Sequence, residues 1–304
     1  MNIELCIPAI KAGAHCLEFY IDNLIQTAAR PDRIKISVSY HNEEDLKWLS
    51  GIRNANRIMS FFHAPSYKEG KFVASANHSS AINILAEYAH GDIVIFSDYD
   101  MAFLRRGWDE DIERVLRSHD FFGTPYAPLE LGFSKDPTGG AAPWLAMNKL
   151  MKYQNTPNLG FFAIKKTSLD RILKDGPLTQ FDKFLNNGGL PFRFVNTKEM
   201  AEELNLSLGA LNWMDTGYEI TGFEKKYGFT HRSLEYIKIA ESEVFTHKFL
   251  LAQVKQIFHP EIFHFDSVPF LFHFKKGTMK AELGGDFNFF DYFKLDVNNY
   301  LAKS

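Results

Sequence analysis

The sequence is poor in cysteine, in basic clusters and in long apolar runs, and each absence argues against a class of protein. Only two of its 304 residues are cysteines, Cys6 and Cys16, too few for a disulfide framework, so we interpret both as thiols in a reducing compartment. The 34 basic residues nearly balance the 37 acidic ones, and no basic block indicates a nucleic-acid partner. No apolar run reaches the roughly 18 residues that a membrane-spanning helix needs.

Several targeting and catalytic motifs are also missing. The first ten residues lack the basic stretch and apolar core of a signal peptide, so we expect a first strand there and a cytoplasmic protein. The sequence contains no phosphate-binding loop ending in Gly-Lys-Ser/Thr, no Gly-x-Ser-x-Gly elbow and no His-Glu-x-x-His helix.

Phenylalanine, by contrast, is abundant. The chain has 29 phenylalanines, many of them near its end in IFHFDSVPFLFHF and FNFFDYF. We expect a compact aromatic core with a docked C-terminal helix. A peripheral contact with a membrane or a partner through this aromatic C-terminus is the alternative.

Strands and helices alternate through the first hundred residues. The patterns predict strands over 3–10, 34–40 and 56–64, and helices over 16–29, 45–52 and 74–90. Gly91 is placed to end the last helix in a left-handed conformation. This alternation predicts a mostly parallel α/β sheet with helices on both faces. The pattern loosens after residue 120, with a loop rich in Gly, Pro and Ala over 123–158 and a further helix over 198–212.

The sequence GDIVIFSDYD places two carboxylates directly after a strand that is apolar throughout. Residues 93–96 are followed by Ser97, Asp98, Tyr99 and Asp100. Ligands of open parallel sheets bind beyond the carboxyl ends of the strands. Paired carboxylates there form a hard oxygen site for Mn²⁺ or Mg²⁺, which can neutralise a departing diphosphate. The stretch therefore predicts a metal and phosphate site.

A second pair with the same spacing, Asp109 and Asp111, provides an internal comparison. It follows Trp108 and opens a helix-like run, DEDIERVL. Acidic side chains in a first helical turn interact favourably with the helix dipole. We therefore predict a structural role for this pair.

The stretch INILAEYAHGDIVIFSDYDMAF resembles the Asn…Ala-x-Gly-Asp…Asp-x-Asp core of nucleotide-sugar glycosyltransferases of the GT-A fold, and is similar to the inverting family 2. Asn83 lies eight residues before Gly91, as the family's helix asparagine does. Pro8 matches the loop that borders the base, and Ser39 ends the second strand near the base and ribose. The resemblance covers roughly residues 3–108 and continues only as short motifs.

The resemblance implies a set of site residues. Those implied to bind the nucleotide-sugar cofactor are Pro8, Ser39, Asn83, Ser97, Asp98, Tyr99 and Lys276. Those implied to hold the metal, Mn²⁺ or Mg²⁺, are Asp98, Asp100 and His273.

The segment NWMDTGYEI (212–220) resembles the family's place for the base that deprotonates the acceptor. Asp215 is the first candidate and Glu219 the second, and the flat faces of Trp213 and Tyr218 suit a sugar ring. A helix cap at Asp215 with two packing aromatics is the structural alternative.

The segment HFKKGTMK (273–280) resembles the C-terminal metal histidine and basic diphosphate loop of GT-A enzymes. Lys275 and Lys276 would then face phosphate oxygens. The alternative is that PFLFHF is a core strand with His273 buried in it. His259 and His264 show no metal-ligand spacing, and we expect both to be structural.

Together these features predict one GT-A (Rossmann-like) domain. Residues 1–118 form the nucleotide-sugar and metal-binding half, and 119–304 the acceptor-binding half with a C-terminal metal and diphosphate segment. The predicted activity is metal-dependent, inverting transfer of a sugar from a nucleotide diphosphate donor to an acceptor hydroxyl of a glycan or glycoconjugate. Retention, a non-catalytic sugar- or nucleotide-binding protein and a nucleotidyltransferase remain alternatives.

Overall fold

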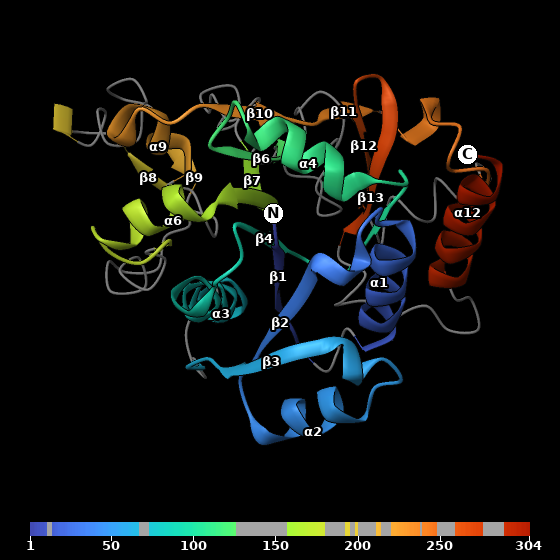
Figure 1. Ribbon diagram of the computed structural model, residues 1–304, viewed down its shortest axis with the longest axis horizontal. Helices are drawn as coiled ribbons and strands as arrows, with labels where there is room; N and C mark the ends of the chain where they lie inside the picture. Colours follow the sequence, from blue (N-terminus) through green and yellow to red (C-terminus); the bar gives the residue numbers. More distant parts are fainter. Residues whose placement is uncertain are drawn as a thin grey trace, which may run out of the picture.

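A computed structural model describes most of the chain, and the statements below concern those residues. They are 1–10, 14–66, 73–125, 157–179, 192–194, 198–199, 211–213, 220–237, 239–247, 259–275 and 289–304. Within them, a seven-stranded sheet and a four-stranded sheet are flanked by helices (Figure 1).

The seven-stranded sheet has the order β10-β6-β7-β4-β1-β2-β3. The strands are β1 (Ile3–Pro8), β2 (Ile34–Tyr40), β3 (Ile58–His63), β4 (Ile93–Ser97), β6 (Phe121–Pro125), β7 (Pro157–Lys165) and β10 (His231–Ser233). Strands β4, β1, β2 and β3 are parallel neighbours, while β7 runs antiparallel to both β4 and β6. The predicted mostly parallel sheet is confirmed.

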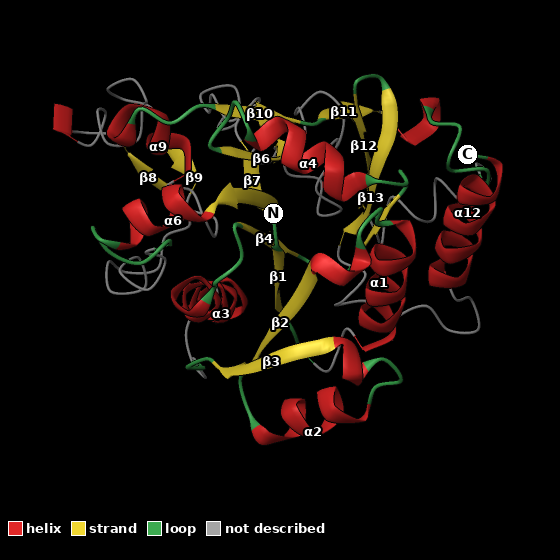
Figure 2. Cartoon of the chain, viewed as in Figure 1, coloured by secondary structure: helices red, strands yellow, loops and turns green. Residues whose placement is uncertain are grey.

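Helices cover both faces of this sheet. They are α1 (Ala14–Thr27), α2 (Glu43–Gly51), α3 (Val73–Tyr88), α4 (Trp108–Leu116), α6 (Lys166–Leu173) and α9 (Ile220–Tyr227). A further helix, α12 (Phe289–Lys303), packs on the four-stranded sheet instead. Alternate residues of β4 belong to two separate cores, one shared with α1 and α4 and the other with α3, α6 and α9. Figure 2 shows α1 and α3 on opposite sides of β1 and β4. None of the described helices is long and apolar enough to cross a membrane.

The four-stranded sheet is antiparallel, with the order β11-β12-β13-β5. Its strands are β11 (Glu235–Ile237), β12 (His259–Phe265), β13 (Val268–Lys275) and β5 (Met101–Phe103). Phe293 of α12 stacks on Phe274 of β13 with ring centroids 5.0 Å apart, and it makes an edge-to-face contact with Phe19 of α1. The aromatic core and docked C-terminal helix predicted above are confirmed for these residues.

Two predictions of local structure were wrong. Helix α3 ends at Tyr88, and Gly91 does not have a positive φ. Gly91 is instead favoured by close approach, because a Cβ there would lie 2.8 Å from the backbone nitrogen of Glu4. The helix expected to reach residue 212 fails at its end, since β9 (Leu211–Trp213) is a strand paired with β8 (Phe192–Phe194). Pairing with β8 makes residues 211–213 a strand, and the local helical pattern of the sequence does not reveal that long-range contact.

Candidate metal and nucleotide site

The structure brings together the three residues predicted to hold a metal. One ligand atom from each of Asp98, Asp100 and His273 can be chosen so that all three lie within 4.8 Å of one another. Asp98 is partly exposed, whereas Asp100 and His273 are buried. Two carboxylate oxygens and an imidazole nitrogen suit a divalent cation such as Mn²⁺.

The two aspartates are attached to different sheets. The backbone nitrogen of Asp98 donates to the carbonyl oxygen of Gly160 on β7 at 2.8 Å. The carbonyl oxygen of Asp100 accepts from the backbone nitrogen of Phe274 on β13 at 2.7 Å. The chain therefore leaves the seven-stranded sheet after Asp98 and joins the four-stranded sheet after Asp100. The cluster lies at this junction.

Tyr99, between the aspartates, points into the protein. Its hydroxyl donates to the carbonyl oxygen of Ile10 at 2.9 Å and accepts from the Ile10 nitrogen at 3.2 Å. Burial raises the pKa of the Tyr99 phenol, which keeps the hydroxyl protonated as a donor. Tyr99 thus ties the segment that follows β1 to the carboxylate loop. A direct contact between Tyr99 and a nucleotide stays a prediction.

Ser97 is fully buried and bonds within the protein. Its hydroxyl accepts from the Tyr20 hydroxyl at 2.7 Å and donates to the carbonyl oxygen of Asp98 at 2.8 Å. These bonds hold the end of β4 against α1, so the contacts seen for Ser97 are structural. Its predicted role toward the donor is not tested by them.

His273 is both a core-strand residue and a member of the cluster, so the two alternatives for it are not exclusive. Its Nε2 lies 3.3 Å from Asp100 Oδ1, and its Nδ1 lies 2.9 Å from Glu261 Oε2. Burial lowers the pKa of His273, but the hydrogen bonds and charges of Asp100 and Glu261 outweigh burial and raise it to about 10. In the metal-free protein the imidazolium therefore lies between two carboxylates.

This raised pKa predicts a pH dependence of stability. Because the folded value of about 10 exceeds the ordinary 6.5, the stabilising contribution is fully present below pH 6.5 and is lost as the pH rises through 10. We expect the melting temperature of the metal-free wild type to fall more steeply over this interval than that of His273→Gln. Thermal denaturation of both proteins in chelator measures this difference, and parallel curves would contradict it.

Sequence reasoning missed two residues of this site. Glu261 appeared to be one charge in an apolar strand, and only its pairing with His273 reveals a role. His78 of α3 lies with Nε2 3.3 Å from Asp98 Oδ1. The available signal for His78 was its position, five residues before Asn83 on the same helix. Both contacts depend on long-range packing.

The other predicted nucleotide contacts lie at strand ends or on α3. Pro8 ends β1 and is the register partner of Ser39 near the end of β2. The buried Ser39 hydroxyl has no hydrogen-bond partner among the described residues. Asn83 forms a reciprocal pair with the backbone of Thr179, at 2.8 Å and 3.0 Å, so its amide is engaged within the protein. Ser39 thus has hydrogen-bonding capacity that Asn83 has already used.

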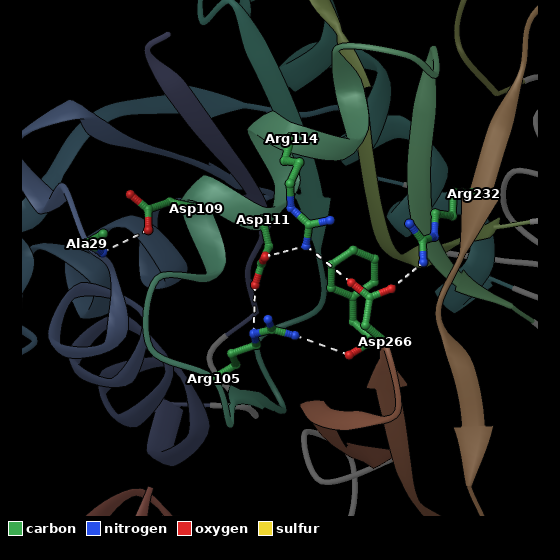
Figure 3. A network of polar contacts seen from close by, with 8 residues as sticks. Ala29, Arg105, Asp109, Asp111, Arg114, Arg232 and Asp266 are labelled. Carbon is green, nitrogen blue, oxygen red and sulfur yellow. Dashed lines mark hydrogen bonds and ion pairs between the residues drawn. The ribbon is translucent and has the colours of Figure 1, made fainter.

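The comparison pair Asp109 and Asp111 has structural contacts. Asp109 is buried and accepts hydrogen bonds from the backbone nitrogens of Ala29 and Arg30. Asp111 pairs with Arg105 and Arg114, each at 2.8 Å (Figure 3). These contacts agree with the structural role predicted for this pair, and the metal role of Asp98 and Asp100 stays a prediction.

Three predicted residues lie outside the described part of the chain: Asp215, Glu219 and Lys276. In the sequence, Asp215 and Glu219 fall between the end of β9 and the start of α9. Lys276 directly follows β13, the strand that carries His273. Their roles remain predictions.

No protein-family model matches the sequence, and no curated protein matches it. One similar solved structure is the mannosyltransferase PcManGT from Pyrobaculum calidifontis in complex with GDP-Man and Mn²⁺. Its sequence is 15% identical, and the superposition has a TM-score of 0.37 and covers 57% of this chain and 46% of that one. TarS residues 1–349 from S. aureus is 13% identical with a TM-score of 0.34, over 57% and 49%. The UDP complex of TarS 1–349 is 12% identical with a TM-score of 0.35, over the same shares. The chain spans about half the length of these structures.

Proposed function

We propose that this protein is a divalent-metal-dependent glycosyltransferase that moves a sugar from a nucleotide diphosphate donor to an acceptor hydroxyl with inversion. The observation that carries the proposal is the cluster of Asp98, Asp100 and His273 after the carboxyl end of β4. Open α/β sheets bind their ligands at that edge.

The residues present fit Mn²⁺ or Mg²⁺. Asp98 and Asp100 offer hard oxygen donors, and His273 offers a nitrogen that Mn²⁺ accepts more readily than Mg²⁺ does. When bound, the ion would supply positive charge that stabilises the leaving diphosphate. Partly exposed Asp98 leaves the cluster open on one side, as a site that also holds a substrate requires.

The donor would extend from this cluster across neighbouring strand ends. Because β1 and β2 follow β4 in the sheet order, Pro8 and Ser39 lie at the same edge as the aspartates. Ser39 is the proposed contact to the base or ribose, which requires its buried hydroxyl to become accessible when the donor binds. His78, beside Asp98, is placed to contact the diphosphate. Lys276 would add a second cation there, since it follows the strand of His273.

The acceptor would be deprotonated from the segment before α9. Asp215 is the proposed general base and Glu219 the alternative, each a carboxylate that takes the proton of the acceptor hydroxyl as the glycosidic bond forms. Residues 119–304 would form the acceptor-binding half, together with the C-terminal metal and diphosphate segment, and the acceptor would be a glycan or glycoconjugate.

A donor screen tests this proposal. A ligand that binds only the folded state raises its melting temperature, so we expect one class of nucleotide sugar to stabilise the protein in Mn²⁺ and not in chelator. That sugar nucleotide should then be hydrolysed or transferred with release of the nucleoside diphosphate. Stabilisation without release, with acceptors supplied, would indicate a non-catalytic binding protein. No stabilisation by any nucleotide sugar in Mn²⁺ would contradict the proposal.

A further inference from the structure

Glu261 is a buried carboxylate to which the proposed function gives no role. It lies on β12, is 6% exposed and has the fully buried Ile262 as its neighbour in the chain. Burying an ionised carboxylate is costly unless a partner compensates it. One of its partners is His273, a proposed metal ligand, whose Nδ1 lies 2.9 Å from Glu261 Oε2. We propose that Glu261 is a positioning residue that holds His273 in the orientation and tautomer that bind the divalent metal.

The strand register places the three groups in a row. Glu261 is the register partner of His273 across β12 and β13, and His273 is the partner of Met101 across β13 and β5. Asp100 directly precedes β5, and its carbonyl oxygen is bonded to the nitrogen of Phe274. Two hydrogen-bonded strands thus fix the backbones that carry Glu261 and His273, and the bend that carries Asp100 is hydrogen-bonded to β13.

The side chains complete this order. The Nδ1–H group of His273 donates to Glu261 Oε2 at 2.9 Å, and Nε2 faces Asp100 Oδ1 at 3.3 Å. A carboxylate can only accept, so the proton of a neutral His273 is held on Nδ1. The lone pair then lies on Nε2, the nitrogen that faces the aspartates. This is the form of histidine that binds a metal.

Glu261 therefore acts on the metal through another residue. Partners that orient a ligating histidine and increase its basicity typically change metal affinity by about 10- to 100-fold when they are removed. If Glu261 were only a structural ion-pair partner of His273, its removal would change stability and leave the metal affinity of the folded protein unaltered. Stability and metal affinity must therefore be measured separately.

The chain offers a matched control for this measurement. His231 of β10 has its Nδ1 2.6 Å from Glu224 Oε1 of α9, which is the same type of carboxylate–imidazole contact. His231 lies in the seven-stranded sheet and Glu224 on α9, and neither residue belongs to the metal cluster. Glu224→Met therefore removes a carboxylate–imidazole hydrogen bond of the same kind, at a more exposed position, without touching the proposed site.

The experiment compares Glu261→Met, Glu261→Gln and Glu224→Met with the wild type. Methionine has a similar length and offers no comparable acceptor, whereas glutamine keeps an acceptor oxygen for Nδ1–H. The Mn²⁺ dissociation constant is measured from the electron paramagnetic resonance signal of free Mn²⁺. Melting temperatures are measured in Mn²⁺ and in chelator. We expect about 10- to 100-fold weaker Mn²⁺ binding in Glu261→Met, recovery of most of the affinity in Glu261→Gln, and no change in Glu224→Met.

The inference rests on the proposed metal site, and the results separate the two. A wild type that binds no Mn²⁺ would refute the site itself. If Glu261→Met binds Mn²⁺ as tightly as the wild type, only the role of Glu261 is refuted. Equal losses of Mn²⁺ affinity in Glu261→Gln and Glu261→Met would refute that role as well. If Glu261→Met does not fold, Glu261→Asp is the variant to measure, because its shorter side chain moves the acceptor oxygen away from His273. We expect Glu261→Asp to bind Mn²⁺ more weakly than the wild type. An unchanged Mn²⁺ affinity would overturn the inference.

Discussion

Replacing Asp100 by asparagine is expected to abolish Mn²⁺-dependent binding of the nucleotide-sugar donor. Asparagine keeps the size of the side chain but removes the negative charge that faces His273 and the proposed ion. Loss of one partner from a buried charged contact costs about 2–5 kcal/mol, so we expect Mn²⁺ affinity to fall by about 30-fold or more. Asp98→Asn should weaken binding less, because Asp98 is the more exposed of the two. Titration with Mn²⁺, followed by the donor thermal shift, measures both effects.

Asp111→Asn is the control for this experiment. Asp111 belongs to an Asp-x-Asp pair of identical spacing but bonds Arg105 and Arg114 at the start of α4. We expect it to retain wild-type Mn²⁺ affinity. Asp109 is a poorer control, because its two backbone hydrogen bonds to Ala29 and Arg30 support the fold. Equal losses in Asp100→Asn and Asp111→Asn would show that the metal assignment is wrong.

Asp215→Asn is expected to lower the rate of sugar transfer by roughly two to four orders of magnitude, the usual contribution of a general base. Asparagine keeps the shape of the side chain and cannot take the acceptor proton. Donor binding should be nearly unchanged, because Asp215 is proposed to face the acceptor. Single-turnover transfer, measured at saturating donor beside the donor thermal shift, separates the two effects.

Glu219→Gln is the companion variant for Asp215. If Glu219→Gln slows transfer and Asp215→Asn does not, the roles of the two carboxylates are reversed. If neither variant slows transfer, an inverting mechanism that uses residues 212–220 is wrong. Melting temperatures of both variants show whether a helix-capping role accompanies the chemistry.

Local patterns predicted the first hundred residues well. The predicted strand over 34–40 coincides with β2, and the apolar run before Asp98 is β4. These elements are specified by their own hydrophobic periodicity and by residues that end a helix, such as Pro31. The position of the carboxylates followed as well, because the end of a parallel strand is itself a local feature.

The rest of the site depends on contacts between segments far apart in sequence. The roles of Glu261 and His78 appear only when β12 pairs with β13 and α3 packs on the sheet. The reason predicted for Gly91 was wrong. A close approach to the backbone of Glu4 and a left-handed helix cap both favour glycine, so the sequence looks the same in either case. Residue type alone could not separate these explanations.

The junction of the two sheets has a consequence for synthesis of the chain. Asp98 and Asp100 leave the ribosome well before β13, which pairs with one edge of β5 and carries the third proposed ligand. Until then, the apolar strand Met101–Phe103 is an unpaired edge open to aggregation. The proposed metal site would until then have only its two carboxylates. Full metal affinity would therefore be acquired once β13 has been synthesised, in the same step that pairs β5 with β13.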